Sequence, residues 1–235
     1  MIDYSFDSCG KVVPKGCFAD FIKHLVESEG LEAVYCPVKS SELDTLLMMD
    51  KVDLIPCTFE TERRSQFGDF AAFLYTTRVE GVCRKKGRKV FTQEDLHRPD
   101  VTIVLSKGEI GWEFALDNLD LAKNPYRRFF VSEHERVEDM MHLVAAGDYD
   151  VALADALSCR IFCRDNPRSA ALAFAYRPED VLSVRRVGTM IPKGDLQYAD
   201  WITEKFRIAR RAPEVQLAEK EALEKSLGAF TTRPL

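Results

Sequence analysis

Two adjacent arginines, Arg63 and Arg64, are the residues of this chain best suited to bind an anion. They follow a short apolar run at residues 52–55, which predicts a buried strand, and Pro56 marks its end. An arginine just beyond the C-terminal end of a buried strand lies where open α/β sheets bind their ligands. Its guanidinium group can hold a carboxylate or a phosphate through two parallel hydrogen bonds. The alternative is a solvated basic pair on a surface turn.

Short strands and helices alternate along the chain, which predicts an α/β fold with largely parallel sheets. The predicted strands lie at residues 33–38, 79–83, 101–105 and 151–154. The predicted helices carry residues 18–26 (ending at Gly30), 43–47 (capped by Ser40 or Ser41) and 137–144 (after a capping box at Ser132 and Glu135, ending at Gly147). Trp201, Phe206 and Ile208 lie in a late amphipathic helix.

The composition describes a globular protein without an electrostatic footprint for nucleic acid or anionic membrane. The 235 residues are 46% hydrophobic, and the net charge of −5 comes from charges of both signs spread along the chain. No apolar stretch approaches the about 20 residues that a membrane span needs. The densest basic cluster, residues 84–89, is interpreted as a solvated loop or hairpin tip rather than a binding patch.

The segment from Asp53 to Tyr75 resembles the family-3 solute-binding proteins of amino-acid ABC transporters. Their pattern here is approximately D-L-I-x-x-x-x-T-x-T-x-E-R, followed after a short gap by D-F-S-x-P-Y. The matching residues are Asp53-Leu54-Ile55, Thr61-Glu62-Arg63-Arg64, Asp69-Phe70 and Tyr75. The spacing to Asp69-Phe70 makes Arg64, not Arg63, the counterpart of the family's carboxylate-binding arginine.

Further motifs follow in family order. Residues 16–21 (G-C-F-A-D-F) look like the family's G-F-D-V-D-L, and residues 106–111 (S-K-G-E-I-G) resemble its Q-x-G-T-T-G loop. Residues 146–155, ending in Asp155, resemble G-x-x-D-A-x-x-x-D, and residues 187–195 resemble G-I-A-V-x-K-G-D. The resemblance therefore covers most of the chain.

The resemblance implies a bilobed, type II periplasmic-binding-protein fold with a ligand cleft between two α/β lobes. Lobe 1 would comprise residues 1–78 and 186–235, and lobe 2 residues 79–185. The two crossings, at residues 76–78 and 184–186, would form a hinge that lets the lobes close on a ligand.

The resemblance also assigns roles to particular residues. An α-amino acid presents a carboxylate and an ammonium group, and an unpaired buried charge is costly, so a site needs a partner for each. Arg64 would bind the carboxylate, Thr58 would be the hydroxyl ligand, and Asp155 would bind the ammonium. Asp155 could also cap the helix that follows it. Tyr4 is the counterpart of an aromatic residue that often stacks on the ligand, or else a core aromatic.

The chain departs from the family at Glu109 and Ile110, where threonines usually follow the glycine. Backbone N–H groups at this helix start could still bind a carboxylate, but the hydroxyl is absent. Glu109 would repel an anionic ligand if it faced the cleft. Alternatively, it points to solvent and stabilises the helix start, or the ligand is cationic or not a standard amino acid.

Three functions follow. The first is a non-enzymatic solute-binding protein for an amino acid or similar small polar ligand, monomeric, with an ABC-transporter permease as a partner or with a sensing role. The second is an enzyme similar to cyclohexadienyl or arogenate dehydratases, with Glu109 as general acid. The third is a degenerate member that acts through protein contacts. We expect no metal, cofactor or nucleic-acid partner, because no ligand cluster or phosphate loop is present in the sequence.

The location is predicted in two ways that disagree. The resemblance implies the periplasm. The start of the chain has no signal-peptide pattern and lacks the strand that the family has before Tyr4, and seven cysteines are many for an oxidising compartment, so the cytoplasm is the alternative. The cysteines form no C-x-x-C motif, and each is expected to act as a small buried hydrophobe. Cys159 and Cys163 could share a helix face.

Overall fold

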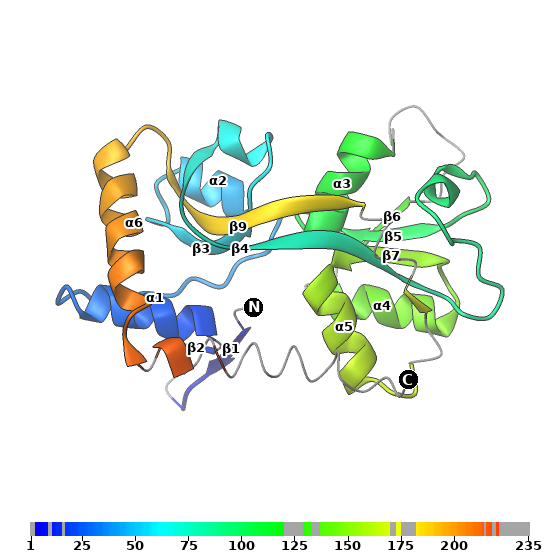
Figure 1. The fold of residues 1–235 in the computed structure, drawn as a ribbon, viewed down its shortest axis with the longest axis horizontal. Helices are drawn as coiled ribbons and strands as arrows, with labels where there is room; N and C mark the ends of the chain where they lie inside the picture. The colour runs from blue at the N-terminus through cyan, green and yellow to red at the C-terminus, as the bar shows by residue number, and fades with distance from the viewer. Residues whose placement is uncertain are drawn as a thin grey trace. The chain divides into compact units, whose positions relative to one another are not determined.

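A computed structural model describes residues 3–8, 11–15, 17–119, 129–132, 137–169, 173–174, 182–213, 215–217 and 220. The chain divides into two compact units, Met1–Tyr75 with Arg186–Leu235 (unit 1) and Thr76–Arg185 (unit 2). Strands β4 (Gly68–Cys83) and β9 (Ser183–Pro192) each contribute residues to both units (Figure 1). The lobes expected from the sequence, 1–78 with 186–235 and 79–185, stay a prediction.

Unit 1 contains a sheet in the order β3-β9-β4, where β3 is Ile55–Phe59. Strand β3 pairs antiparallel with β9, so that Ile55 lies opposite Met190. Helices α1 (Cys17–Glu27), α2 (Leu43–Met48) and α6 (Leu196–Ala209) belong to the described part of this unit, and a short 3-10 helix spans Arg64–Gln66. Strands β1 (Asp3–Phe6) and β2 (Val12–Lys15) form a separate antiparallel pair.

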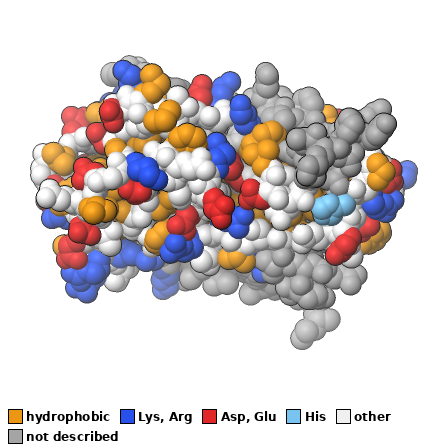
Figure 2. Space-filling model, turned by 90° about the horizontal axis from the view of Figure 1, so that it is seen from above, with side chains coloured by type: hydrophobic (Ala, Val, Ile, Leu, Met, Phe, Trp, Pro, Cys, Tyr) orange, Lys and Arg blue, Asp and Glu red, His pale blue; other side chains and the backbone are white. Residues whose placement is uncertain are grey.

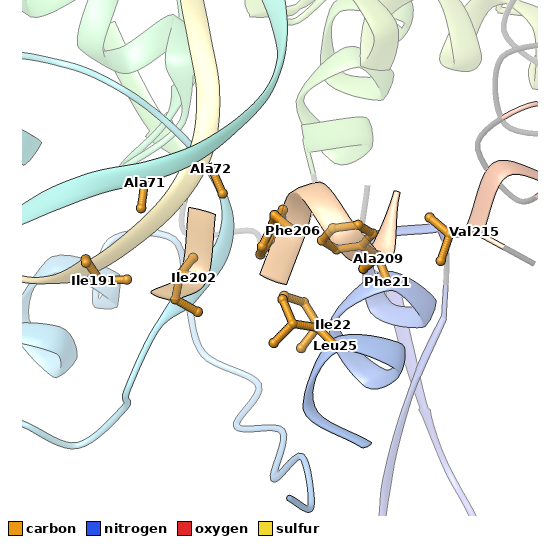
Figure 3. Close-up of a cluster of buried hydrophobic side chains, with 10 residues drawn as sticks. All are labelled: Phe21, Ile22, Leu25, Ala71, Ala72, Ile191, Ile202, Phe206, Ala209 and Val215. Atoms are coloured by element: carbon orange, nitrogen blue, oxygen red, sulfur yellow. The ribbon is translucent and has the colours of Figure 1, made fainter. Parts of the chain in front are cut away.

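The apolar faces of α1 and α6 form the core of unit 1 together with the sheet (Figure 3). Phe21 of α1 meets Phe206 of α6 with ring centroids 4.2 Å apart. Ala71 and Ile191 bring the sheet into the same cluster. The helical spacing of apolar residues along α1 was therefore a correct indication of a buried face, and Gly30, at φ +71°, lies just beyond the end of that helix as predicted.

Unit 2 contains the sheet order β4-β7-β5-β6, with β8 (Ala173–Phe174) on β4. The other strands are β5 (Ile103–Ser106), β6 (Phe129–Ser132) and β7 (Val151–Asp155). Its helices are α3 (Ile110–Asn118), α4 (Val137–Ala146) and α5 (Ala156–Asp165), with a 3-10 turn at Glu94–His97. Figure 1 shows α3 on one side of this sheet and α4 and α5 on the other.

The α/β class is confirmed, but the pairing is more mixed than expected. Strand β5 is parallel to both β6 and β7, whereas β4 is antiparallel to β7 and β8. The carboxyl ends of β5, β6 and β7 consequently meet at one edge of the unit 2 sheet.

Three local expectations were wrong. Residues 33–38 form no strand, and Val34 is 88% exposed, because β-propensity without a neighbouring strand to pair with does not make a sheet. Helix α2 begins after Glu42 with no side-chain cap, so neither Ser40 nor Ser41 caps it. Strand β3 begins at Ile55 and runs to Phe59, so Pro56 lies inside the strand and does not end it. The capping-box residue Glu135 lies outside the described residues.

Charges of both signs are interspersed over the described surface of the face shown in Figure 2. No helix among the described residues combines the length and the apolarity needed to cross a bilayer.

Candidate functional site

Arg64 and Thr58 lie together in unit 1. Arg64 opens the 3-10 helix that follows β3, and its side chain is 1% exposed. Its Nη1 donates to the Oγ1 of Thr58 at 2.7 Å, and its backbone N–H donates to the Oγ1 of Thr61 at 3.1 Å. The Thr58 hydroxyl therefore holds the guanidinium from β3, and the Thr61 hydroxyl holds the backbone at the start of the 3-10 helix. Arg64 is not part of a solvated basic pair.

Asp44 is the partner that the sequence did not reveal. Its Oδ1 is 3.3 Å from the Nε of Arg64, and its Oδ2 is 3.0 Å from the Nη2 of Arg63. The Asp44 side chain is 11% exposed and that of Arg63 is 42% exposed, so only one of the two arginines is buried with this acid. Asp44 lies three residues before the buried Leu47 of α2, and an acid on an apolar helix face is the signal that could have found it.

This ion pair gives Arg64 two possible uses. A buried cation needs a counter-charge, and Asp44 supplies one within unit 1. At the same time, Asp44 and Thr58 hold the guanidinium in a single orientation, which is the preorganisation that carboxylate binding requires.

Asp155 ends β7 and is the N-cap of α5 in unit 2. Its Oδ1 accepts the backbone N–H groups of Leu157 and Ser158, both at 3.0 Å. The capping interpretation is therefore correct, and both bonds use the same oxygen. Among the described residues, no hydrogen bond to Oδ2 is present.

Glu109 and Ile110 begin α3, which follows β5. Glu109 occupies the N-cap position without a side-chain cap bond, and Ile110 is buried at 1% exposure, so its side chain belongs to the core. Only the backbone of Ile110 could contact a ligand. Since β5 and β7 are parallel and adjacent, Glu109 and Asp155 lie at the same edge of the unit 2 sheet.

Gly111, the second glycine of the same loop motif, is a packing residue. A Cβ at this position would lie 2.1 Å from the backbone oxygen of Leu153. The glycine thus lets the first turn of α3 rest directly on β7.

A buried acid with two arginines lies next to Asp155. The Oε1 of Glu80, on β4, accepts from the Nε of Arg78 at 2.8 Å and from the Nη2 of Arg160 at 3.0 Å. Glu80 is 1% exposed, and its neighbour Val79 is paired with Asp155 across the sheet. Sequence reasoning missed this cluster, although Glu80 interrupts the otherwise apolar run at residues 79–83.

The predicted site residues thus form two groups, Thr58 and Arg64 in unit 1, and Glu109, Ile110 and Asp155 in unit 2. Tyr4 lies on β1 opposite Pro14, and its side chain is outside the described part of the structure.

Comparison with solved structures identifies the architecture. A solute receptor for L-cysteine from Neisseria gonorrhoeae matches with a TM-score of 0.75 at 16% identity, over 98% of this chain and 88% of that one. A histidine kinase sensor domain described as similar to periplasmic binding proteins matches with 0.74 at 20% identity, over 93% and 89%. An ancestral amino-acid-binding protein, described as a precursor of cyclohexadienyl dehydratase, matches with 0.73 at 18% identity, over 93% and 88%.

This chain has the type II periplasmic-binding-protein fold. No protein-family model and no curated protein sequence matches it.

The described part of this periplasmic-binding-protein fold contains no group of three or more potential metal ligands. Its cysteines differ in environment. Burial raises the pKa of Cys83 to about 12 and also raises the pKa of Cys159, whereas Cys36 is exposed. Cys83 and Cys159 therefore act as small apolar residues, as expected, and Cys36 does not. Cys159 and Cys163 both lie on α5.

Proposed function

We propose that this chain is a solute-binding protein that closes its two lobes on an amino acid or a similar small polar ligand. The fold supports this proposal, because proteins that share it are named as a solute receptor for L-cysteine and an ancestral arginine-binding protein, and a putative ABC-transporter binding component with this fold is complexed with lysine. In the proposed complex Arg64 binds the ligand carboxylate and Asp155 binds its ammonium group.

The observation that carries the proposal is the fixed orientation of Arg64. Its Nη1 is bound to Thr58 at 2.7 Å and its Nε faces Asp44 at 3.3 Å, at the start of the 3-10 helix that follows β3. A guanidinium held in this way loses little conformational entropy when a carboxylate binds. Asp155 offers a complementary anion at a strand end of unit 2, with Oδ1 engaged by the helix and Oδ2 available to a cation.

The test is a thermal-shift screen against the twenty amino acids, polyamines, small carboxylates and prephenate. A ligand that binds only the folded state raises stability by about 2.7 kcal/mol at a hundredfold excess over Kd. Arg64→Lys keeps the positive charge beside Asp44 but removes the guanidinium group that could bind a carboxylate through two hydrogen bonds. Arg63→Lys is the matched control, because Arg63 pairs with the same Asp44. We expect Arg64→Lys to abolish the ligand-dependent shift and Arg63→Lys to retain it. An undiminished shift in Arg64→Lys would refute the assignment.

A dehydratase-like enzyme is the second candidate, because one structural neighbour is described as a precursor of cyclohexadienyl dehydratase. Glu109 is the candidate general acid, at the N-cap of α3 and without a capping bond. Turnover of prephenate or arogenate that disappears in Glu109→Gln would favour this function. Binding without turnover would favour the solute-binding protein.

The biological role within the first proposal is delivery to an ABC-transporter permease in the periplasm or ligand sensing. Sensing is favoured by the histidine kinase sensor domain among the neighbours. A screen in which no compound stabilises the protein would instead favour a module that acts through protein contacts.

A further inference from the structure

A hollow of about 470 Å³ lies at the opposite end of β7 from Asp155. It is lined by the loop after β4 and by the last turn of α4, namely Arg84, Lys85, Lys86, Gly87, Ala145, Ala146 and Gly147. Its size is within the range of small-molecule pockets. All of these residues belong to unit 2, so the hollow does not depend on how the two units are arranged.

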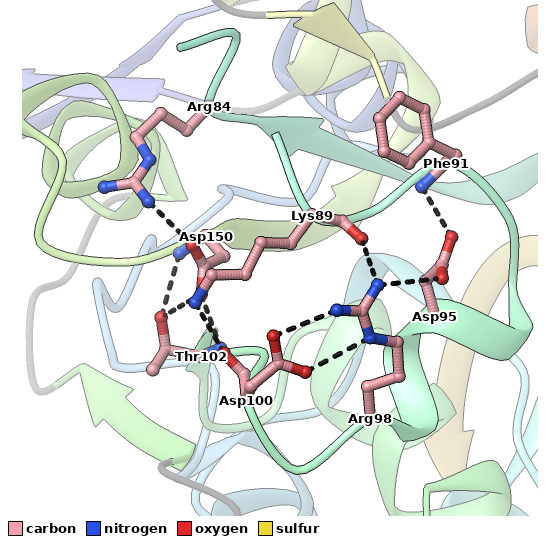
Figure 4. A network of polar contacts seen from close by, with 8 residues as sticks. All are labelled: Arg84, Lys89, Phe91, Asp95, Arg98, Asp100, Thr102 and Asp150. Carbon is pink, nitrogen blue, oxygen red and sulfur yellow. Dashed lines mark hydrogen bonds and ion pairs between the residues drawn. The ribbon is translucent and has the colours of Figure 1, made fainter. Parts of the chain in front are cut away.

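Buried Asp150 anchors one wall of the hollow (Figure 4). Its Oδ1 is 3.0 Å from the Nη2 of Arg84, and its Oδ2 is 3.1 Å from the Nζ of Lys89. The backbone N–H and the hydroxyl of Thr102 also donate to Oδ2, each at 2.9 Å. Arg84 in turn donates from Nη1 to the oxygen of Gly147 at 2.9 Å, which ties the loop to the end of α4. The hollow is therefore a built feature rather than a gap between mobile loops.

The side chains around this hollow carry more positive than negative charge. Asp150 is shared by Arg84 and Lys89, which leaves one surplus charge in that cluster. Lys85 and Lys86 are exposed and have no ion-pair partner among the described residues. The free carbonyl groups at the end of α4 would repel an anion. The carbonyl of Gly147, however, already accepts a hydrogen bond from Arg84.

One buried donor beside the hollow also lacks an acceptor. The Nε of Arg84 is buried and has no hydrogen-bond partner among the described residues. Because that atom is inaccessible to solvent, a ligand in the hollow could not reach it, and the exposed donors there are the ammonium groups of Lys85 and Lys86.

We propose that this hollow binds a phosphate group, with Lys85 and Lys86 as flexible cationic contacts and Arg84 as the fixed one. A phosphate dianion offers several acceptor oxygens to such donors. The site is separate from the proposed amino-acid site, because Asp150 precedes β7 and Asp155 ends it, about 16 Å of extended chain apart. The phosphate could belong to a soluble metabolite or to a lipid headgroup.

The experiment measures pyrophosphate binding by isothermal titration calorimetry at constant ionic strength. Lys85→Ala/Lys86→Ala is the test variant. Lys51→Ala/Arg168→Ala removes two exposed positive charges elsewhere and is the control, and thermal unfolding confirms that both variants fold. We expect one site per chain, at least tenfold weaker affinity in the test variant, and less than twofold change in the control. Binding to vesicles with and without phosphatidic acid, measured by sedimentation, forms the second arm.

Pyrophosphate binding that depends on Lys85 and Lys86 supports a soluble phosphate ligand. Sedimentation with phosphatidic-acid vesicles alone, with the same dependence, supports a lipid headgroup. Absence of binding in both arms, or an equal loss in test and control variants, would overturn the proposal, because general charge would then account for the effect.

Discussion

Replacing Asp155 by asparagine separates its two proposed roles. The side chain accepts two backbone N–H groups of α5 through one oxygen, each at 3.0 Å. Asparagine caps helices about as well as aspartate, whereas alanine does not, and loss of a cap costs about 1 kcal/mol. We therefore expect Asp155→Asn to unfold at the same urea concentration as the unmodified protein. Asp155→Ala should lose about 1 kcal/mol, or roughly 2–4 °C in Tm for a chain of this size.

Ligand binding should respond in the opposite pattern. A charge-assisted hydrogen bond contributes about 1.5–3 kcal/mol, so the amino acid with the largest thermal shift should bind about 10- to 150-fold more weakly to Asp155→Asn. The affinity would be measured by calorimetry on both variants. Unchanged affinity in Asp155→Asn would show that Asp155 is only a helix cap. A Tm loss in Asp155→Asn equal to that of Asp155→Ala would refute the capping argument itself.

Three further results are expected. Gly111→Ala should destabilise unit 2 by about 3 kcal/mol, because its Cβ would lie 2.1 Å from a backbone oxygen of β7. Urea unfolding measures this loss, and an unchanged unfolding midpoint would mean that α3 does not rest on that strand. Burial alone would raise the pKa of Asp150, but its hydrogen bonds hold that pKa below the ordinary 3.8. The ionised carboxylate therefore stabilises the fold at neutral pH, and this contribution is lost as the pH falls below about 4. Asp150→Asn should therefore lower the free energy of unfolding at pH 7 and flatten its decline towards acid, and parallel pH profiles would contradict this. With a thiol reagent at pH 8, Cys36 should react at once, whereas Cys83 and Cys159 should react only when the protein unfolds. Mass spectrometry detects the modified residues, and early modification of Cys83 would contradict its burial.

Local periodicity and capping chemistry predicted the elements whose stabilising contacts are near in sequence. Helix α1 and its end at Gly30, and the succession of β7, Asp155 and α5, follow from residues within one or two turns of each other. The strand expected at residues 33–38 failed because a strand depends on a partner that its own sequence does not encode.

The charged clusters show a second limit. The interpretation of residues 84–89 as a solvated loop overlooked Arg84 and Lys89, which converge on Asp150, more than sixty positions later in the chain. Asp44 was likewise overlooked beside Arg64. The signs of the charges are visible in a sequence, whereas their pairing across distant segments is set by the fold.

The two strands that the units share have a consequence for how the protein is made. Unit 2 is one uninterrupted stretch of chain, whereas unit 1 is assembled from an early and a late stretch. The pairing of Ile55 with Met190 cannot form until residue 190 has left the ribosome, by which time all of unit 2 has been synthesised. Closing that long loop carries an entropic cost that is lower if the intervening chain has already folded. Unit 2 can thus fold during synthesis and act as a scaffold before β9 arrives to pair with β3 and complete the sheet of unit 1.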